Sequence, residues 1–353
     1  YKRQVLPWPL EPGPWNLEPA MANFQLYAVE DAGPRPLPVP PDATQFTDLY
    51  RGLPLGVYDA LRTFDHNKFL YLNRHLARTE RSMALLGWAY RLDRARLLRA
   101  LHAVVTAAEW PEMRVRFDVL AAAATTGPAE ALGTTSRELI ALQPFTPPPP
   151  ELYERGVAVG FAGGLAREQP LAKTADFAAR RPATAGLAAL ERPPRQGPGS
   201  RGQGPGEEHS SLEPGTWPLE PASAVGGRPS VVAPYEYLLL DSAGRILEGT
   251  GTNFWAVRDG VMYTAGEGVL EGITREILLQ LIAGLGIPLR LEAVGAADVA
   301  TLDEAALSGS SRALLPVVSI AGQTVGDGRP GPIVGRVLAA YNAFVAENVR
   351  TAM

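Results

Sequence analysis

The sequence predicts an α/β protein with two domains. Segments that alternate every second residue, as strands do, are interspersed with segments of helical period. A proline-rich break at residues 145–150 divides these segments into two groups. The chain has 353 residues and is 46% hydrophobic, so it can bury more than one core. We therefore expect a small N-terminal α/β domain, a proline-rich linker and a larger C-terminal domain, at residues 23–145, 146–152 and 153–350.

The N-terminal domain is expected to form around a sheet. Residues 1–22, which precede it, are rich in Pro and Trp and lack a period, which indicates a disordered arm. A polar turn at 65–68 joins two of the strands as a hairpin, and Asn73 can cap the helix that follows. The strands are predicted at 24–29, 56–64, 69–71, 113–120 and 137–142, and the helices at 73–86 and 93–108.

The C-terminal domain is expected to hold several strands and two longer helices. Thr274 can cap the first of these helices. Residues 191–230 are rich in Pro, Gly, Arg and Ser, have no period and are predicted to be a disordered insertion. Residues 212–222 nearly repeat residues 10–20, which we interpret as duplicated low-complexity sequence. The strands are predicted at 157–161, 235–241, 246–257 and 306–317, and the last helix at about 333–348.

The composition excludes several classes of function. The net charge of −4 argues against a nucleic-acid partner. No apolar run reaches the length of a membrane span and no signal-peptide pattern is present, so we expect a cytoplasmic protein without a membrane partner. The chain has no cysteine, and its 4 histidines lack ligand spacing, so we expect no metal site.

Lys173 is the residue that points to chemistry. The chain has few lysines, and this one alone is flanked by small and apolar residues, after a Gly-rich strand-like run. A lysine amine is a nucleophile only when it is deprotonated, and a partly desolvated site favours that form. The local sequence also allows a surface lysine at the end of a strand.

Four separated motifs, in this order, resemble the fold-type IV pyridoxal-phosphate enzymes. That family holds branched-chain aminotransferases, D-amino acid aminotransferases, (R)-selective amine transaminases and aminodeoxychorismate lyases. The motifs are GVYDALR at 56–62 with HLAR at 75–78, the isolated Lys173, LEGTGTNF at 247–254, and the pair LEGITR at 270–275 and SGSS at 308–311. The resemblance implies the two-domain architecture of a D-amino acid aminotransferase. It also implies pyridoxal 5'-phosphate at the domain interface and a homodimer.

The resemblance also implies roles for individual residues. Lys173 matches the catalytic lysine that forms the internal aldimine. Glu248 matches the acid at the pyridine nitrogen, although a glutamate here could also be an exposed residue at the end of a strand. The expected cofactor-binding residues are Arg78, Lys173, Glu248, Asn253, Gly272, Ile273, Thr274, Ser310 and Ser311. The expected substrate-binding residues are Tyr58, Arg62, Arg114 and Arg116, of which the three arginines could equally be surface residues of strands.

The implied reaction is transfer of an amino group between a branched-chain-like amino acid and a 2-oxo acid such as 2-oxoglutarate. One alternative is a lyase that converts aminodeoxychorismate into 4-aminobenzoate and pyruvate. Another is a non-catalytic binding protein on the same fold, against which Lys173 and Glu248 together argue. Branched-chain enzymes usually carry a tyrosine five residues after the lysine, where this chain has Ala178. This departure concerns the substrate rather than the cofactor.

Overall fold

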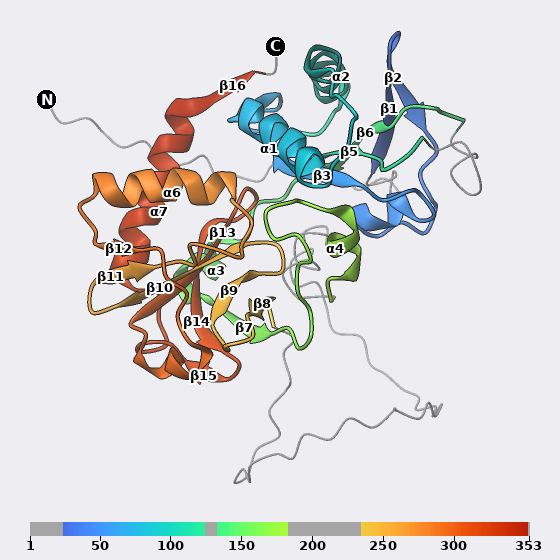
Figure 1. Cartoon of the computed structure of the whole chain (residues 1–353). Helices are drawn as coiled ribbons and strands as arrows, with labels where there is room; N and C mark the ends of the chain where they lie inside the picture. Colours follow the sequence, from blue (N-terminus) through green and yellow to red (C-terminus); the bar gives the residue numbers. More distant parts are fainter. Residues whose placement is uncertain (1–23, 124–132, 183–233, 352–353) are drawn as a thin grey trace, which may run out of the picture.

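A computed structural model of the chain describes residues 24–123, 133–182 and 234–351 (Figure 1). Within these ranges the chain forms two α/β domains, each organised around its own large sheet. The predicted arm at 1–22 and the predicted insertion at 191–230, with the repeated sequence that they share, lie outside the described residues. Among the described residues, no helix is long and apolar enough to span a membrane.

The N-terminal domain contains a five-stranded antiparallel sheet with the strand order β2-β1-β6-β5-β3. Apolar residues of β5 such as Val115 and Phe117 face the helices, while Arg114, Arg116 and Asp118 alternate with them, as the sequence predicts. The strands are β1 (Gln25–Glu30), β2 (Gly33–Leu37), β3 (Val57–Arg62), β5 (Met113–Val119) and β6 (Glu138–Pro144).

The helices α1 (Leu72–Leu85) and α2 (Arg94–Ala107) pack on this sheet through a shared apolar cluster. The carboxylate of Asp93 caps α2, because it accepts a hydrogen bond from the backbone N–H of Arg96 at 2.9 Å. A second apolar cluster packs the 3-10 helix η1 (Phe46–Tyr50) against β1 and β6. The sheet is therefore buried on both sides, and the polar residues of β5 lie within the protein.

The predicted turn at 65–68 is present, because Phe64 and Lys68 form an antiparallel bridge with two backbone hydrogen bonds, at 2.8 and 2.9 Å. Beyond this bridge the hairpin does not continue as predicted, and the strand β4 (Lys68–Leu70) pairs with β16 (Val349–Thr351) near the C-terminus. The reason is that Phe69 packs into the core of the N-terminal domain and Leu70 into that of the C-terminal domain, so β4 lies between the two. Asn73 does not cap α1, which begins one residue earlier, after Tyr71 in a left-handed conformation.

The C-terminal domain contains a nine-stranded sheet. Its main path runs β12-β11-β10-β13-β14-β7-β8-β9, and β9 also pairs with β10. This additional pairing closes the strands from β10 to β9 into a ring. The strands are β7 (Val157–Phe161), β8 (Glu236–Leu240), β9 (Ile246–Gly249), β10 (Asn253–Arg258), β11 (Val261–Tyr263), β12 (Leu289–Arg290), β13 (Glu304–Gly309), β14 (Ala313–Ile320) and β15 (Gln323–Thr324).

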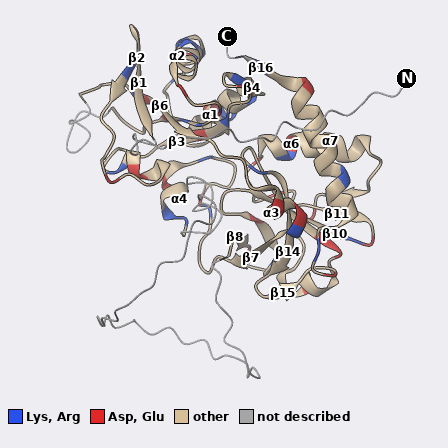
Figure 2. Ribbon diagram, turned by 180° about the vertical axis from the view of Figure 1, so that it is seen from behind, with Lys and Arg blue, Asp and Glu red and all other residues tan. Residues whose placement is uncertain are grey.

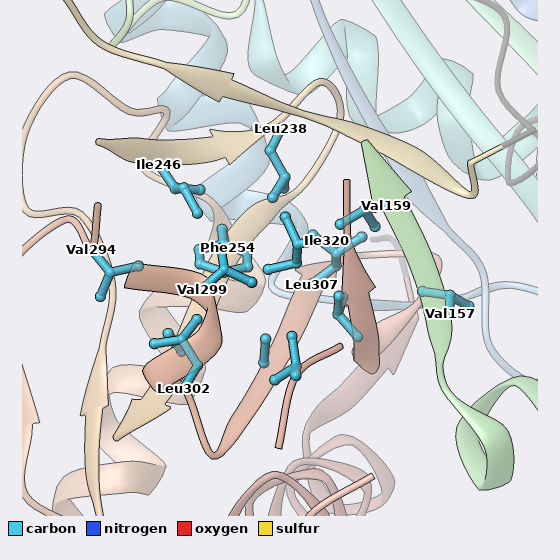
Figure 3. Close-up of a cluster of buried hydrophobic side chains, with 14 of the residues drawn as sticks. Val157, Val159, Leu238, Ile246, Phe254, Val294, Val299, Leu302, Leu307 and Ile320 are labelled. Carbon is cyan, nitrogen blue, oxygen red and sulfur yellow. The ribbon is translucent and has the colours of Figure 1, made fainter. Parts of the chain in front are cut away.

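Two apolar clusters hold this domain together. In the first, side chains from several strands, such as Val159, Leu238 and Phe254, point toward one another (Figure 3). The second packs the sheet against α6 (Ile273–Gly284) and α7 (Pro332–Asn348). Neighbours on β10 alternate between the clusters, since Phe254 belongs to the first and Trp255 to the second.

Short helices complete the chain. The helix α3 (Pro150–Arg155) begins with a proline in its first turn, so the C-terminal end of the predicted linker is helical. The helix α4 (Ala175–Arg180) lies next to β3 of the N-terminal domain (Figure 1), and the 3-10 helix η3 (Ala296–Thr301) packs on the first cluster. Seen from behind, acidic and basic residues are interspersed over both domains (Figure 2).

Candidate active site

A large cavity lies between the two domains. It encloses about 1470 Å³ of space, including the part of its mouth that is open to solvent. The N-terminal domain contributes Phe46, Tyr58 and residues of β5, and the C-terminal domain contributes loops around β9, β13 and α6. Of the predicted site residues, those that line this cavity are Tyr58, Arg78, Arg114, Arg116, Lys173, Glu248, Asn253, Gly272, Ile273, Thr274, Ser310 and Ser311.

The backbone around Lys173 is attached to the N-terminal domain. The carbonyl of Lys173 accepts a hydrogen bond from the N–H of Tyr58 at 3.1 Å, and its own N–H donates to the hydroxyl of Ser82 at 3.1 Å. Two residues on, the N–H of Ala175 donates to the carbonyl of Gly56 at 2.8 Å. A Cβ atom at Gly56 would lie 2.1 Å from a backbone oxygen, so only glycine fits there. These contacts hold the lysine against β3.

The side chain of Lys173 lies in a strongly positive environment. Burial lowers the pKa of its amine, and the charges of Arg78 and Arg167 lower it further, while Tyr58 and Asp59 act in the opposite direction. Its Nζ atom lies 4.8 Å from the centre of the Tyr58 ring. Such a lysine has a larger neutral fraction at a given pH than an exposed one, which a nucleophilic amine requires.

The cations around the cavity also change the pKa of Tyr58. Burial alone would raise the pKa of its phenol, but Lys173, Arg181, Arg116 and Arg167 outweigh burial and lower the pKa to about 7. Its ring packs against Ala178, the small residue that stands where branched-chain enzymes usually have a tyrosine.

Glu248 is held at the point where β9 meets β10. Its Oε1 atom accepts a hydrogen bond from Nε of Arg167 at 2.6 Å. Its Oε2 atom accepts longer hydrogen bonds from the N–H of Leu270 at 3.2 Å and from Nδ2 of Asn253 at 3.4 Å. Burial raises the pKa of this carboxyl group, and Arg167 opposes the rise. Glu248 is therefore a buried acid, not an exposed residue at the end of a strand.

The N-terminus of α6 offers a place for an anion. The helix starts after Gly272, and its first N–H groups have no acceptor within the helix. No side chain caps it, and Thr274 is a residue of the first turn rather than the cap that the sequence predicts. A Cβ atom at Gly272 would lie 2.2 Å from Oδ1 of Asn253, so glycine is required. Across the cavity, Ser310 and Ser311 form the turn between β13 and β14.

Arg78 also lines the cavity, and its guanidinium is held by the buried carboxylate of Asp59. Its Nε and Nη2 atoms donate to the two carboxylate oxygens of Asp59 at 2.9 and 2.7 Å. The ring of His75 lies 2.8 Å from the same carboxylate. Asp59 is fully buried, and although burial alone would raise its pKa, Arg78 and His75 hold that pKa well below its usual range. The remaining Nη1 atom donates to the carbonyl of Glu271 at 3.3 Å, next to α6.

The predicted substrate-binding arginines do not all reach the cavity. Arg114 and Arg116 line it. Arg116 is held by two hydrogen bonds to Asp118, at 2.9 and 2.6 Å, and its guanidinium lies over the ring of Tyr58. Arg62 is absent from the lining of this cavity; it lies over the rings of Phe64 and Phe145 and forms an ion pair with Glu112 at 3.5 Å.

Sequence reasoning missed several residues that line the cavity or support it. Arg167 contacts Glu248 directly, yet nothing in its local sequence distinguishes it from the many other arginines. Asp59 lies inside a recognised motif and could have been identified as the partner of a nearby arginine. Glu236 and Thr252 each have a buried oxygen without a hydrogen-bond partner among the described residues.

The lining of the cavity is rich in positive charge. Among the described residues, the acidic side chains that belong to it are those of Glu236 and Glu248. Its basic residues are Arg78, Arg114, Arg116, Arg167, Lys173, Arg181 and Arg312. A nucleophilic amine, a buried acid and the free N–H groups of a helix N-terminus thus face one basic cavity. This donor set fits a phosphorylated aldehyde cofactor with a ring nitrogen.

Comparison with models of known protein families matches this chain to one family. The family model for amino-transferase class IV matches residues 56–182 and 232–320, which is more than half of the chain. The matched segments include Lys173, Glu248, the N-terminus of α6 and the turn that contains Ser310 and Ser311. The intervening residues, which contain the predicted insertion, are not matched.

Curated relatives match over a shorter stretch. The branched-chain-amino-acid aminotransferase of Escherichia coli (strain K12) is 37% identical over 108 residues, which is 30% of this chain and 35% of that protein. The D-alanine aminotransferase of Bacillus licheniformis is 34% identical over 111 residues, 31% of this chain and 39% of that protein. The chain therefore matches these relatives over little more than a third of their length.

Solved structures match over nearly the whole chain. The branched-chain aminotransferase of the thermophilic archaeon Thermoproteus uzoniensis, solved with norvaline, has a TM-score of 0.60 and 20% identity, over 93% of this chain and 99% of that chain. A branched-chain amino acid aminotransferase solved with pyridoxamine 5'-phosphate has a TM-score of 0.64 and 18% identity, over 93% and 98%. These neighbours confirm the two-domain α/β fold, and the family match shows that the chain belongs to class IV of the aminotransferases.

Proposed function

We propose that the protein is an aminotransferase that depends on pyridoxal 5'-phosphate. It would move an amino group between an amino acid, branched-chain-like, and a 2-oxo acid such as 2-oxoglutarate. The observation that carries this proposal is that Lys173, Glu248 and the N-terminus of α6 face one cavity. These are the three kinds of group that the aldehyde, the ring nitrogen and the phosphate of this cofactor need. The names of the sequence relatives support the substrate classes.

The residues of the cavity would divide the binding of the cofactor among them. Lys173 would bind its aldehyde carbon, and Glu248, oriented by Asn253, would bind its ring nitrogen. The phosphate would lie against the N–H groups of Ile273 and Thr274 at the start of α6, where donors without acceptors favour an anion. Residues that complete the phosphate site in this proposal are Arg78, Gly272, Ser310 and Ser311.

The bound cofactor supplies an electron-accepting ring that stabilises negative charge on the substrate carbon next to the amino group. Lys173 then has a second task, because its released amine can take the proton from that carbon and return it elsewhere. The lowered pKa of Lys173 supports this task, since only the neutral amine accepts a proton. Tyr58 lies beside the amine and would take the place of the hydroxyl that Ala178 lacks.

The substrate would lie between the cofactor and the N-terminal domain. Arg114 and Arg116 line that side, and a guanidinium is suited to hold a carboxylate. Arg62 is not part of the proposed substrate site. It does not line this cavity, because it forms an ion pair with Glu112 and packs over the rings of Phe64 and Phe145. A cytoplasmic homodimer belongs to the same proposal, and sedimentation equilibrium of the purified protein tests its oligomeric part.

The test of the reaction is a half-reaction followed by absorbance. Purified holoenzyme is mixed with L-leucine, L-valine or L-glutamate, and with D-amino acids and an (R)-amine in the same panel. Amino transfer predicts that the absorption band of the bound cofactor bleaches and that 2-oxoglutarate restores it. Failure of every donor, together with release of pyruvate from aminodeoxychorismate without an acceptor, would overturn the proposal in favour of the lyase.

A further inference from the structure

Arg167 is an unassigned buried cation in direct contact with the proposed acid of the site. Its Nε atom bonds Oε1 of Glu248 at 2.6 Å, which is the shortest contact that this carboxylate makes among the described residues. The other two donors to the carboxylate, Leu270 and Asn253, are neutral and more distant, at 3.2 and 3.4 Å. The side chains of Arg167 and Glu248 are 7% and 2% exposed, so water screens their attraction little.

A ring holds the guanidinium in this place. The centre of the Phe177 ring lies 3.9 Å from the guanidinium carbon of Arg167, and Phe177 is itself buried. Phe177 belongs to α4, which begins two residues after Lys173. The same segment therefore carries Lys173 and supports Arg167. The pair is therefore built into the site and does not depend on an exposed, mobile side chain.

We infer that Arg167 is a positioning residue that keeps Glu248 ionised, so that the proton shared between this carboxylate and the cofactor's ring nitrogen resides on the nitrogen. This inference rests on the proposed function, because it assigns Arg167 a role in tuning the cofactor. It concerns the protonation state of Glu248, whereas the proposed function concerns what Glu248 binds.

The physical reason is the position of the charge. A buried carboxylate without a cation takes up a proton, because the neutral acid costs less to desolvate. A proton on Glu248 would lie beside the guanidinium of Arg167 and be repelled by it. A proton on the ring nitrogen instead leaves the carboxylate charged and keeps its attraction to Arg167, so the proton is more stable there. Oε2, with only long hydrogen bonds, can still accept one from the ring nitrogen.

The inference is tested with R167Q, which removes the charge, and with R167K, which keeps it. The control is R116Q, which removes a different buried cation from the same cavity. Each protein is loaded with pyridoxal 5'-phosphate labelled with ¹⁵N in the ring, and the ¹⁵N chemical shift reports whether the nitrogen carries a proton. Wild type, R167K and R116Q are expected to show the protonated shift, and R167Q the unprotonated one. A protonated shift in R167Q with full cofactor occupancy would overturn the inference.

A second measurement needs no cofactor. Infrared spectra of the apoprotein over a range of pH report the carboxylic-acid band of Glu248, which is assigned by its loss in E248Q. R167Q should shift the disappearance of this band upward by about one to three pH units relative to wild type. R116Q should leave it in place, and an unchanged band in a folded R167Q protein would refute the inference. If wild type itself binds no cofactor, the proposed function fails, while the infrared result still decides the role of Arg167.

Discussion

Glu248 and Asn253 face each other across β9 and β10, and this pair closes the larger sheet into a ring. Asn253 also donates to the carbonyl of Leu270 at 2.8 Å, and its Oδ1 atom fills the space beside Gly272. One residue thus ties the buried acid to the start of α6. The distance between the proposed ring-nitrogen site and the proposed phosphate site is therefore set by the pairing of β9 with β10 and by the hydrogen bond of Asn253 to the segment before α6.

The first prediction concerns Lys173. Reduction of the holoenzyme with borohydride, followed by peptide mapping, should place the cofactor on the peptide that contains Lys173. The variant K173A should retain no covalent cofactor and should lose activity by about 10²-fold or more, because it lacks both the covalent bond and the proton carrier. K68A is the control, because Lys68 forms an exposed ion pair with Asp65 and does not line the cavity. A label on Lys68 would contradict the assignment.

The second prediction concerns the pKa of Tyr58. In the apoprotein, tyrosinate absorbance should appear with a midpoint at about pH 7, because the positive charges around the phenol outweigh its burial. Y58F should remove this transition. K173A should move it toward higher pH, since Lys173 is the first of the charges that lower this pKa. A lowered pKa makes the phenolate's contribution to stability grow as the pH rises from about 7 toward 10, the pKa of an exposed tyrosine. An unaltered transition in Y58F would show that another tyrosine is responsible.

The third prediction concerns Asp59, which holds Arg78 and His75. D59N should destabilise the protein by about 3–5 kcal/mol, because it leaves a buried guanidinium without its counter-charge. Urea unfolding at neutral pH measures this difference, and D176N, an exposed residue of an ion pair on α4, serves as the control. The pKa of Asp59 is depressed in the folded protein, so its contribution is complete above the unfolded pKa near 3.8 and is lost as the pH falls below that value. The difference in the free energy of unfolding between wild type and D59N should therefore decrease only as the pH falls below about 3.8.

A further consequence of Asp59 can be measured on folded protein. If Asp59 orients Arg78 toward the phosphate, D59N should weaken the binding of pyridoxal 5'-phosphate more than that of pyridoxal, which has no phosphate. Equal weakening of both ligands would mean that Asp59 supports the fold alone.

The fourth prediction concerns the predicted insertion at 191–230. The family model matches the chain on both sides of this segment and skips it. Deleting the segment and joining its ends with a short linker should preserve cofactor absorbance and amino transfer. Loop closure changes by only about 0.6 kcal/mol per doubling of loop length, so the fold should tolerate the deletion. Loss of folding on deletion would show that the segment packs against the rest of the protein.

The sequence by itself determined the fold class and the family resemblance, and most of the site residues that it predicts line the cavity. It could do so because these features depend on local chemistry. Alternation predicts strands such as β5, a glycine marks backbone that cannot accommodate a Cβ atom, and a lysine such as Lys173 stands out when few others are present.

Tertiary structure decided which side chains meet. The turn of the predicted hairpin forms, since Phe64 and Lys68 form an antiparallel bridge, but Phe69 and Leu70 are buried in two different cores and pair with the C-terminal strand β16. Arg62 belongs to a recognised motif and Arg167 does not, yet Arg62 lies against two rings outside the cavity and Arg167 donates a hydrogen bond to the buried acid. The partner of a charged residue depends on contacts between segments far apart in the chain, and no local pattern of residues encodes those contacts.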